Sequence, residues 1–163
     1  MRRSASLGVL VGLLAGCGGS GGPSFQRADG WHVLSRNGEL AAANVPFAAA
    51  DRSMASPPAR TVAALQRDGI VIWTMYARGG NDHYPPRRLP LRVEQGVTSN
   101  PFEGFPCAPA VTTSKCYVAS GSIRHLQARS GSYAIDLYVF FGTDRPTSAS
   151  VAAADTELAR LSV

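Results

Sequence analysis

Short apolar runs separated by turn-forming residues make up most of the chain from Trp31 onward. The residues between these runs are mainly Gly, Pro, Asn and Asp, which end strands and helices and favour turns. This pattern predicts a mostly β fold rather than a bundle of long helices. We expect a single antiparallel β-sandwich-like domain over residues 29–163 with one C-terminal helix, and an α+β arrangement is the alternative.

The clearest predicted strand covers residues 70–76, where both alternating sets of side chains are apolar. Such a strand is typical of the centre of a sheet that is covered on both faces. Strands are also expected at 31–35 and 39–45, joined at Asn37-Gly38, because Asn-Gly is a strong hairpin signal. The alanines of the second run favour a helix by themselves, but the segment before Pro46 is too short for one.

A second hairpin is predicted near the C-terminus, with strands at 122–129 and 133–141. In its second strand the odd-numbered side chains share one face, which we assign to the core. A short strand is expected at 91–93, and a single helical turn at 61–65.

Residues 147–161 predict the C-terminal helix. Thr147 or Ser148 is suited to the N-cap position, since a hydroxyl oxygen there accepts a bond from a free N–H of the first turn. The apolar stripe that would pack on the sheet consists of Val151, Ala154, Leu158 and Leu161.

Composition agrees with one ordinary globular domain. The chain has 163 residues, of which 45% are hydrophobic and 17% charged, with a formal net charge of +5. A domain usually takes about 100–200 residues. Three cysteines are too few for a disulfide-dense scaffold, and no apolar run reaches the roughly 18–20 residues of a membrane-spanning helix.

The first residues have the organisation of an export signal. Arg2-Arg3 gives a cationic start, and an apolar run at 7–14 is followed by small residues. We therefore assign residues 1–16 to a signal peptide and exclude them from the fold. The arginine pair leaves both general secretion and twin-arginine export open.

The run ends in Leu14-Ala15-Gly16-Cys17, which resembles the lipobox of bacterial lipoproteins. The resemblance implies cleavage before Cys17 and attachment of diacylglycerol to its thiol, with further acylation by fatty acids such as palmitate. The partner would be membrane lipid, and the location the extracytoplasmic side of the cell membrane. Residues 17–28 are then the lipidated cysteine and a flexible Gly/Ser tether. The alternative is an ordinary secretory signal in which Cys17 is incidental.

Two segments of the body, 42–47 (Ala-Ala-Asn-Val-Pro-Phe) and 68–72 (Asp-Gly-Ile-Val-Ile), loosely resemble uncharacterised exported proteins of high-GC Gram-positive bacteria. This resemblance implies no reaction and no functional residue.

Cys107 and Cys116 are expected to form a disulfide bond, since an exported protein works where disulfides persist. The bond would stabilise the fold by about 2.5–3 kcal/mol through loop closure. A redox or metal-binding pair is the alternative, but the spacing is not that of a Cys-x-x-Cys motif.

Candidate binding residues gather in one loop. Asp82, His83, Tyr84, Arg87 and Arg88 share a proline-rich segment that suits contact with an anionic or aromatic group. The alternative is a basic loop that is merely solvated.

No catalytic motif is present in the sequence, and the three histidines are scattered. The favoured function is a non-catalytic binding or interaction module for an unknown envelope protein or small molecule, with no cofactor and no nucleic-acid partner. The alternative is a small secreted hydrolase or metal-dependent enzyme that uses His83 or His125. Two histidines and a carboxylate converging on one cleft would favour the enzyme.

Overall fold

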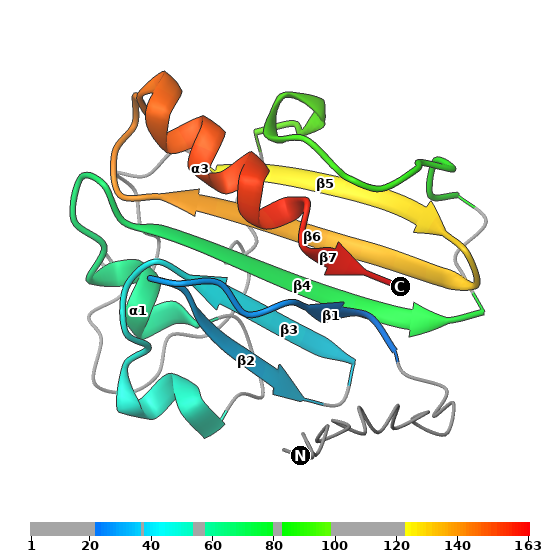
Figure 1. The fold of residues 1–163 in the computed structure, drawn as a ribbon, viewed down its shortest axis with the longest axis horizontal. Coiled ribbons are helices and arrows are strands. Elements are labelled where there is room, and N and C mark those ends of the chain that lie inside the picture. Colours follow the sequence, from blue (N-terminus) through cyan, green and yellow to red (C-terminus); the bar gives the residue numbers. More distant parts are fainter. Residues whose placement is uncertain (1–21, 37, 54–57, 80–82, 99–122) are drawn as a thin grey trace, which may run out of the picture.

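The computed structural model describes residues 22–36, 38–53, 58–79, 83–98 and 123–163. In this part of the chain, a five-stranded antiparallel sheet has the strand order β2-β3-β4-β6-β5, and β1 pairs with β7 in a two-stranded antiparallel sheet (Figure 1). One main helix, α3, lies near the C-terminus. The prediction of a mostly β, antiparallel fold with a C-terminal helix is confirmed.

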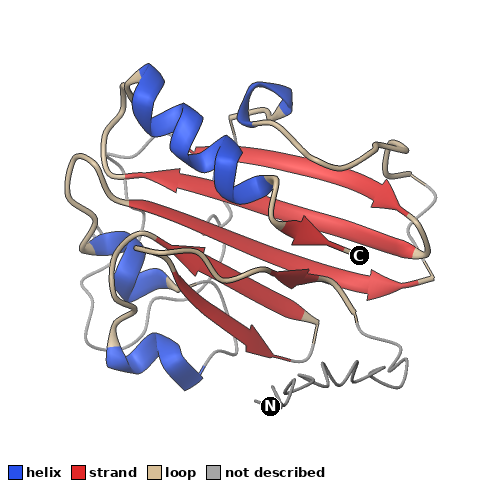
Figure 2. Cartoon of the chain, in the orientation of Figure 1, coloured by secondary structure: helices blue, strands red, loops and turns tan. Residues whose placement is uncertain are grey.

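The strands are β1 (Ser24–Phe25), β2 (His32–Arg36), β3 (Glu39–Ala43), β4 (Ile70–Arg78), β5 (Ile123–Ser130), β6 (Tyr133–Phe141) and β7 (Leu161–Ser162). The helices are η1 (Ala49–Ser53), α1 (Ala59–Ala63), η2 (Val93–Gln95) and α3 (Ser148–Leu158). Figure 2 shows α3, the longest of these helices, lying across one face of the large sheet together with the small sheet. No helix in the described ranges is long and apolar enough to span a membrane.

The large sheet has an apolar core on each face. The first core lies under α3 and the small sheet, and its sheet residues include Leu40, Ile72, Leu126, Ile135, Leu137, Val139 and Phe141. The second core lies on the opposite face, because side chains alternate along each strand, and it contains Ala41, Ala43, Phe47, Val62, Val71, Trp73, Ile123, Tyr138 and Phe140. Strand β4 contributes to both cores, as its unbroken apolar sequence predicts.

Both predicted hairpins are present. β2 pairs with β3 so that Arg36 lies opposite Glu39, and β5 pairs with β6 around Gly131. Gly38 and Gly131 have positive φ angles of 80° and 58°, a conformation that glycine adopts without the steric cost of a Cβ atom. Turn chemistry therefore fixes the register of both hairpins.

The predicted strand at 91–93 is wrong. Leu91 and Val93 are buried in the first core, but residues 93–95 form the short helix η2. The Arg92 N–H donates to the Gln95 side chain at 3.0 Å, and the Val93 N–H donates to the Asp155 carboxylate at 2.8 Å. Side-chain acceptors therefore satisfy backbone groups that a strand would have paired with a neighbouring strand.

Two predicted boundaries also shift. Leu161 was expected on the C-terminal helix, but the helix ends at Leu158 and Leu161 lies in β7 opposite Phe25. Phe25 lies within the segment expected to be tether, yet it is 7% exposed and belongs to the first core. The folded domain therefore includes residues before position 29.

The buried face of α3 includes one carboxyl group. Thr147 is the N-cap, as one of the two predicted choices, and it accepts a bond from the Ser150 N–H at 3.1 Å. Glu157 is 1% exposed, and neither of its carboxyl oxygens has a hydrogen-bond partner in the described part. Burial raises the pKa of Glu157, although Arg160, 3.5 Å away, opposes this shift.

Candidate functional site

A pocket of about 590 Å³ opens at the outer edge of the large sheet, where the chain enters β2. Its lining consists of Arg27, Ala28, Asp29, Trp31, His32, Val33, Leu34, Pro46, Phe47 and Arg52. Pockets that hold small ligands usually measure about 300–1,000 Å³ and combine apolar walls with a few polar groups. This pocket has both properties, and we call it the edge pocket.

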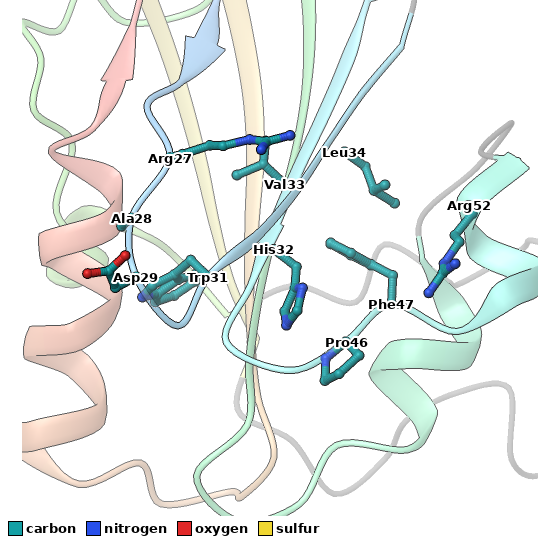
Figure 3. A pocket seen from close by; sticks show the side chains of 10 residues that line it. All are labelled: Arg27, Ala28, Asp29, Trp31, His32, Val33, Leu34, Pro46, Phe47 and Arg52. Atoms are coloured by element: carbon teal, nitrogen blue, oxygen red, sulfur yellow. The ribbon is translucent and has the colours of Figure 1, made fainter.

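The edge pocket takes side chains from both sides of β2 (Figure 3). Trp31 and Val33 pack against the first core, whereas Leu34 and Phe47 belong to the second core or pack against it. Arg27 lies beside Val33 in the figure, and Arg52 lies on the side of Phe47. The pocket is therefore a groove around the edge strand rather than a hole within one core.

Local structure explains how these residues meet. The chain turns before β2, where the Trp31 N–H donates to the Ala28 carbonyl at 3.1 Å and Gly30 has a φ of 77°. This turn brings Arg27 and Trp31 to the start of the strand. Arg52 is carried by η1, which follows Phe47 after a short connection.

The charge in the edge pocket is mainly positive. Arg27 and Arg52 are exposed, and neither makes an ion pair with another described residue. The lining also contains the imidazole of His32 and a single carboxylate, that of Asp29. Guanidinium groups bind carboxylates and phosphates through paired N–H donors and also stack on aromatic rings. The pocket can therefore receive an anionic group attached to an apolar body.

A second polar cluster lies at the other end of the sheet, on β5 and β6. His125 Nε2 forms a short contact with Asp136 Oδ1, and the Tyr84 hydroxyl donates to Asp136 Oδ2 at 3.3 Å. The His125 ring stacks on Tyr138 with centroids 4.2 Å apart, and Tyr138 stacks on Trp73 at 5.5 Å. We call His125, Asp136 and Tyr84 the Asp136 cluster.

Electrostatics keep the phenols near this carboxylate protonated. Burial raises the pKa of Tyr138 to about 12, and the negative charge of Asp136 adds to this shift. Burial also raises the pKa of Tyr84, again with help from Asp136. Tyr84 is therefore a hydrogen-bond donor at neutral pH. In the imidazole tautomer whose Nε2 donates to Asp136, the Nδ1 atom is the hydrogen-bond acceptor.

The structure divides the predicted binding loop. Tyr84 joins Asp136, whereas the Arg87 backbone N–H donates to the Arg129 carbonyl of β5 at 3.1 Å. His83 and Arg88 are exposed. Asp82, Cys17, Cys107 and Cys116 lie outside the described residues. In the described part of the chain, no group of three or more His, Cys, Asp or Glu side chains could hold a metal ion.

Sequence reasoning missed the edge pocket, because its arginines and aromatic residues are spread over positions 27–52 without a motif. Comparison with known proteins adds no assignment: neither the protein-family models nor the curated proteins nor the solved structures give a significant match to the chain.

Proposed function

We propose that the protein is a membrane-anchored extracytoplasmic binding module, lipidated at Cys17, whose edge pocket binds an anionic group attached to an apolar or aromatic body. The observation that carries the proposal is the pair of arginines on opposite sides of one apolar groove (Figure 3). Both residues line the same pocket, and charge-assisted hydrogen bonds to an anion are about twice as strong as neutral ones.

The apolar lining supports the second half of the proposal. The half-buried side chains of Trp31 and Leu34 line the pocket beside the arginines, and Phe47 is held rigidly because it is only 5% exposed. A rigid wall binds a ligand without the entropic cost of ordering it first. The ligand class that fits is a carboxylate with an apolar or aromatic neighbour.

Substituting either arginine tests the binding site. The probes are phenylacetate and its neutral analogue phenylacetamide, titrated into the full-length protein in detergent and followed by calorimetry or by NMR of the Trp31 indole. We expect phenylacetate to bind more tightly than the amide, and Arg27→Gln or Arg52→Gln to weaken phenylacetate about tenfold, or about 1.4 kcal/mol. Arg88→Gln, next to the opposite edge of the sheet, is the matched control. Equal affinity for acid and amide would contradict the proposal.

The anchor is tested separately by Cys17→Ser, which removes the thiol that the lipobox resemblance assigns to diacylglycerol. We expect the variant to lose palmitate labelling and to appear in the aqueous fraction or as unprocessed precursor, since stable membrane binding needs two or more acyl chains. Fractionation and mass spectrometry of the N-terminus provide the measurement. Unchanged labelling of the variant would refute lipidation at this position.

One observation favours acid–base catalysis by His125 as a second candidate function. Asp136 orients the imidazole and Tyr84 holds the other carboxylate oxygen, which is how a carboxylate commonly positions a general base. His125 and Asp136 lie on β5 and β6, at the opposite edge of the sheet from β2, so substitutions in the edge pocket test the two functions independently.

A further inference from the structure

We propose that the natural occupant of the edge pocket is an extended acidic peptide segment of a partner protein, which adds to the large sheet as a sixth strand along β2. This inference rests on the proposed function, since it names the ligand class of the same pocket. It depends on three further features: an edge strand that the described residues leave unpaired, the direction of its backbone groups, and the arrangement of charge around it.

The two edges of the large sheet differ. At the β5 edge, Val97 pairs with His125 through two backbone bonds of 2.8 and 2.9 Å, and Pro86 pairs with Arg129. At the β2 edge, β3 is the only pairing partner among the described residues. An unpaired edge presents a row of backbone donors and acceptors to any extended chain that approaches it.

The hydrogen-bond pattern of β3 shows which residues of β2 face outward. The Tyr76 N–H donates to the Gly38 carbonyl at 2.7 Å, and the Asn44 N–H donates to the Ile70 carbonyl at 3.2 Å. Even-numbered residues of β3 therefore bond to β4, and by alternation the odd-numbered ones bond to β2. The odd-numbered residues of β3 lie opposite His32, Leu34 and Arg36, whose backbone groups therefore face β3. The N–H and C=O groups of Val33 and Ser35, which lie between them, point away from the sheet.

The groove around this edge fits the alternating side chains of an added strand. Successive side chains of a strand point to opposite faces. One set would meet Trp31 and Val33 with Arg27 beside them, and the other would meet Leu34 and Phe47 with Arg52 beside them. Two neighbouring acidic residues on the peptide would therefore reach one arginine each. Main-chain bonds supply affinity in this type of recognition, and side-chain contacts supply specificity.

Charge favours an acidic partner over a second copy of this chain. Pairing β2 with β2 of another copy in the antiparallel direction about Leu34 would bring Arg27 and Arg52 of both copies to one seam. Like charges that lie close together repel each other. Acidic side chains on a partner reverse the sign of the same interactions.

The test uses the full-length protein and a defined probe, the acetylated and amidated peptide Val-Val-Glu-Glu-Val-Val. Two further versions carry backbone N-methyl groups, one on the odd-numbered residues and the other on the even-numbered residues. Only alternate residues of an added strand bond to the sheet, so a peptide bound along β2 loses these bonds in only one of the two versions. We expect one methylated peptide to bind about tenfold or more weakly and the other to bind like the parent. An equal loss of binding for the two methylated peptides would overturn the inference.

A variant of the protein tests the backbone groups of β2 that would form the same hydrogen bonds with the peptide. Ser35→Pro removes an outward N–H without touching the bonds between β2 and β3, and proline is tolerated on edge strands in that position. We expect about a tenfold loss of peptide binding with unchanged binding of phenylacetate, whereas Ser35→Ala keeps both. The experiment with the two methylated peptides does not depend on whether the proline variant folds.

The outcomes separate this inference from the proposed function. Arginine-dependent binding of phenylacetate without a difference between the two methylated peptides would overturn the added strand and leave the anion pocket standing. Failure of both probes would overturn both. Self-association of the protein that Ser35→Pro abolishes, measured by sedimentation, would make the occupant a second copy and likewise overturn the inference.

Discussion

Gly142→Ala is expected to lower the free energy of unfolding by about 3 kcal/mol or more, because the new methyl group has no room. A Cβ atom at this position would overlap the Gln66 carbonyl group, at a separation far below the sum of the van der Waals radii. Hydrogen bonds within the turn hold that oxygen in position. It accepts the Gly69 N–H at 2.8 Å, and the Gly69 carbonyl in turn accepts the Gly142 N–H at 2.9 Å. Displacing this turn would disturb the start of the central strand β4.

Gly79→Ala is the matched control for this substitution. Gly79 has a φ of 77°, but no atom of the described residues lies within 4 Å of its missing Cβ atom, so alanine there costs only the backbone strain of about 1–2 kcal/mol. Urea denaturation of both variants measures the difference. An unfolding free energy for Gly142→Ala equal to that for Gly79→Ala would show that the turn at 66–69 yields to the methyl group.

Asp51→Ala is expected to destabilise the fold by about 3 kcal/mol, because it leaves several buried donors without an acceptor. The Asp51 carboxylate is 8% exposed. It accepts bonds from the Thr61 N–H and hydroxyl, both at 2.6 Å, and from the Arg60 N–H at 3.3 Å. Pro58, the N-cap of α1, makes no side-chain bond to the first turn, so a residue from η1 takes over the capping of α1.

This substitution has a functional consequence as well. Arg52 follows Asp51 directly and lines the edge pocket, so loosening η1 should also weaken the binding of phenylacetate. Asp51→Asn retains an acceptor oxygen and is expected to have an intermediate effect in thermal and chemical denaturation. Asp68→Ala removes an exposed carboxylate and should stay within about 0.5 kcal/mol of the parent protein. A loss of similar size for Asp51→Ala and Asp68→Ala would contradict the capping role.

The elements that the sequence predicts correctly are those governed by neighbouring residues. The unbroken apolar run of β4 predicts a central strand, and the Asn37-Gly38 turn and the small residues around Gly131 predict the hairpins. Thr147 predicts the start of α3. Each signal acts over a few residues, and tertiary contacts reinforce it in this fold.

The predictions that fail depend on partners distant in the sequence. Residues 91–93 contain two apolar side chains at strand spacing, yet the Asp155 carboxylate of α3 satisfies the Val93 N–H and fixes a helical turn. Leu161 continues the helical stripe, yet pairing with Phe25 draws it into β7. Neither partner is visible from the local pattern.

The sequence by itself determined the fold class, the two hairpins, the capped helix and one of the two core faces of β6, because period-two alternation and turn chemistry need only local information; the burial of Tyr138 and Phe140 on the other face was not predicted. Only the tertiary structure decided the two sites. Arg27 and Arg52 line one pocket because β2 is an outer strand whose groove takes residues from both faces, and His125 reaches Asp136 because β5 and β6 pair in one register. Strand order and register bring these distant residues together, and no local sequence motif predicts that they become neighbours.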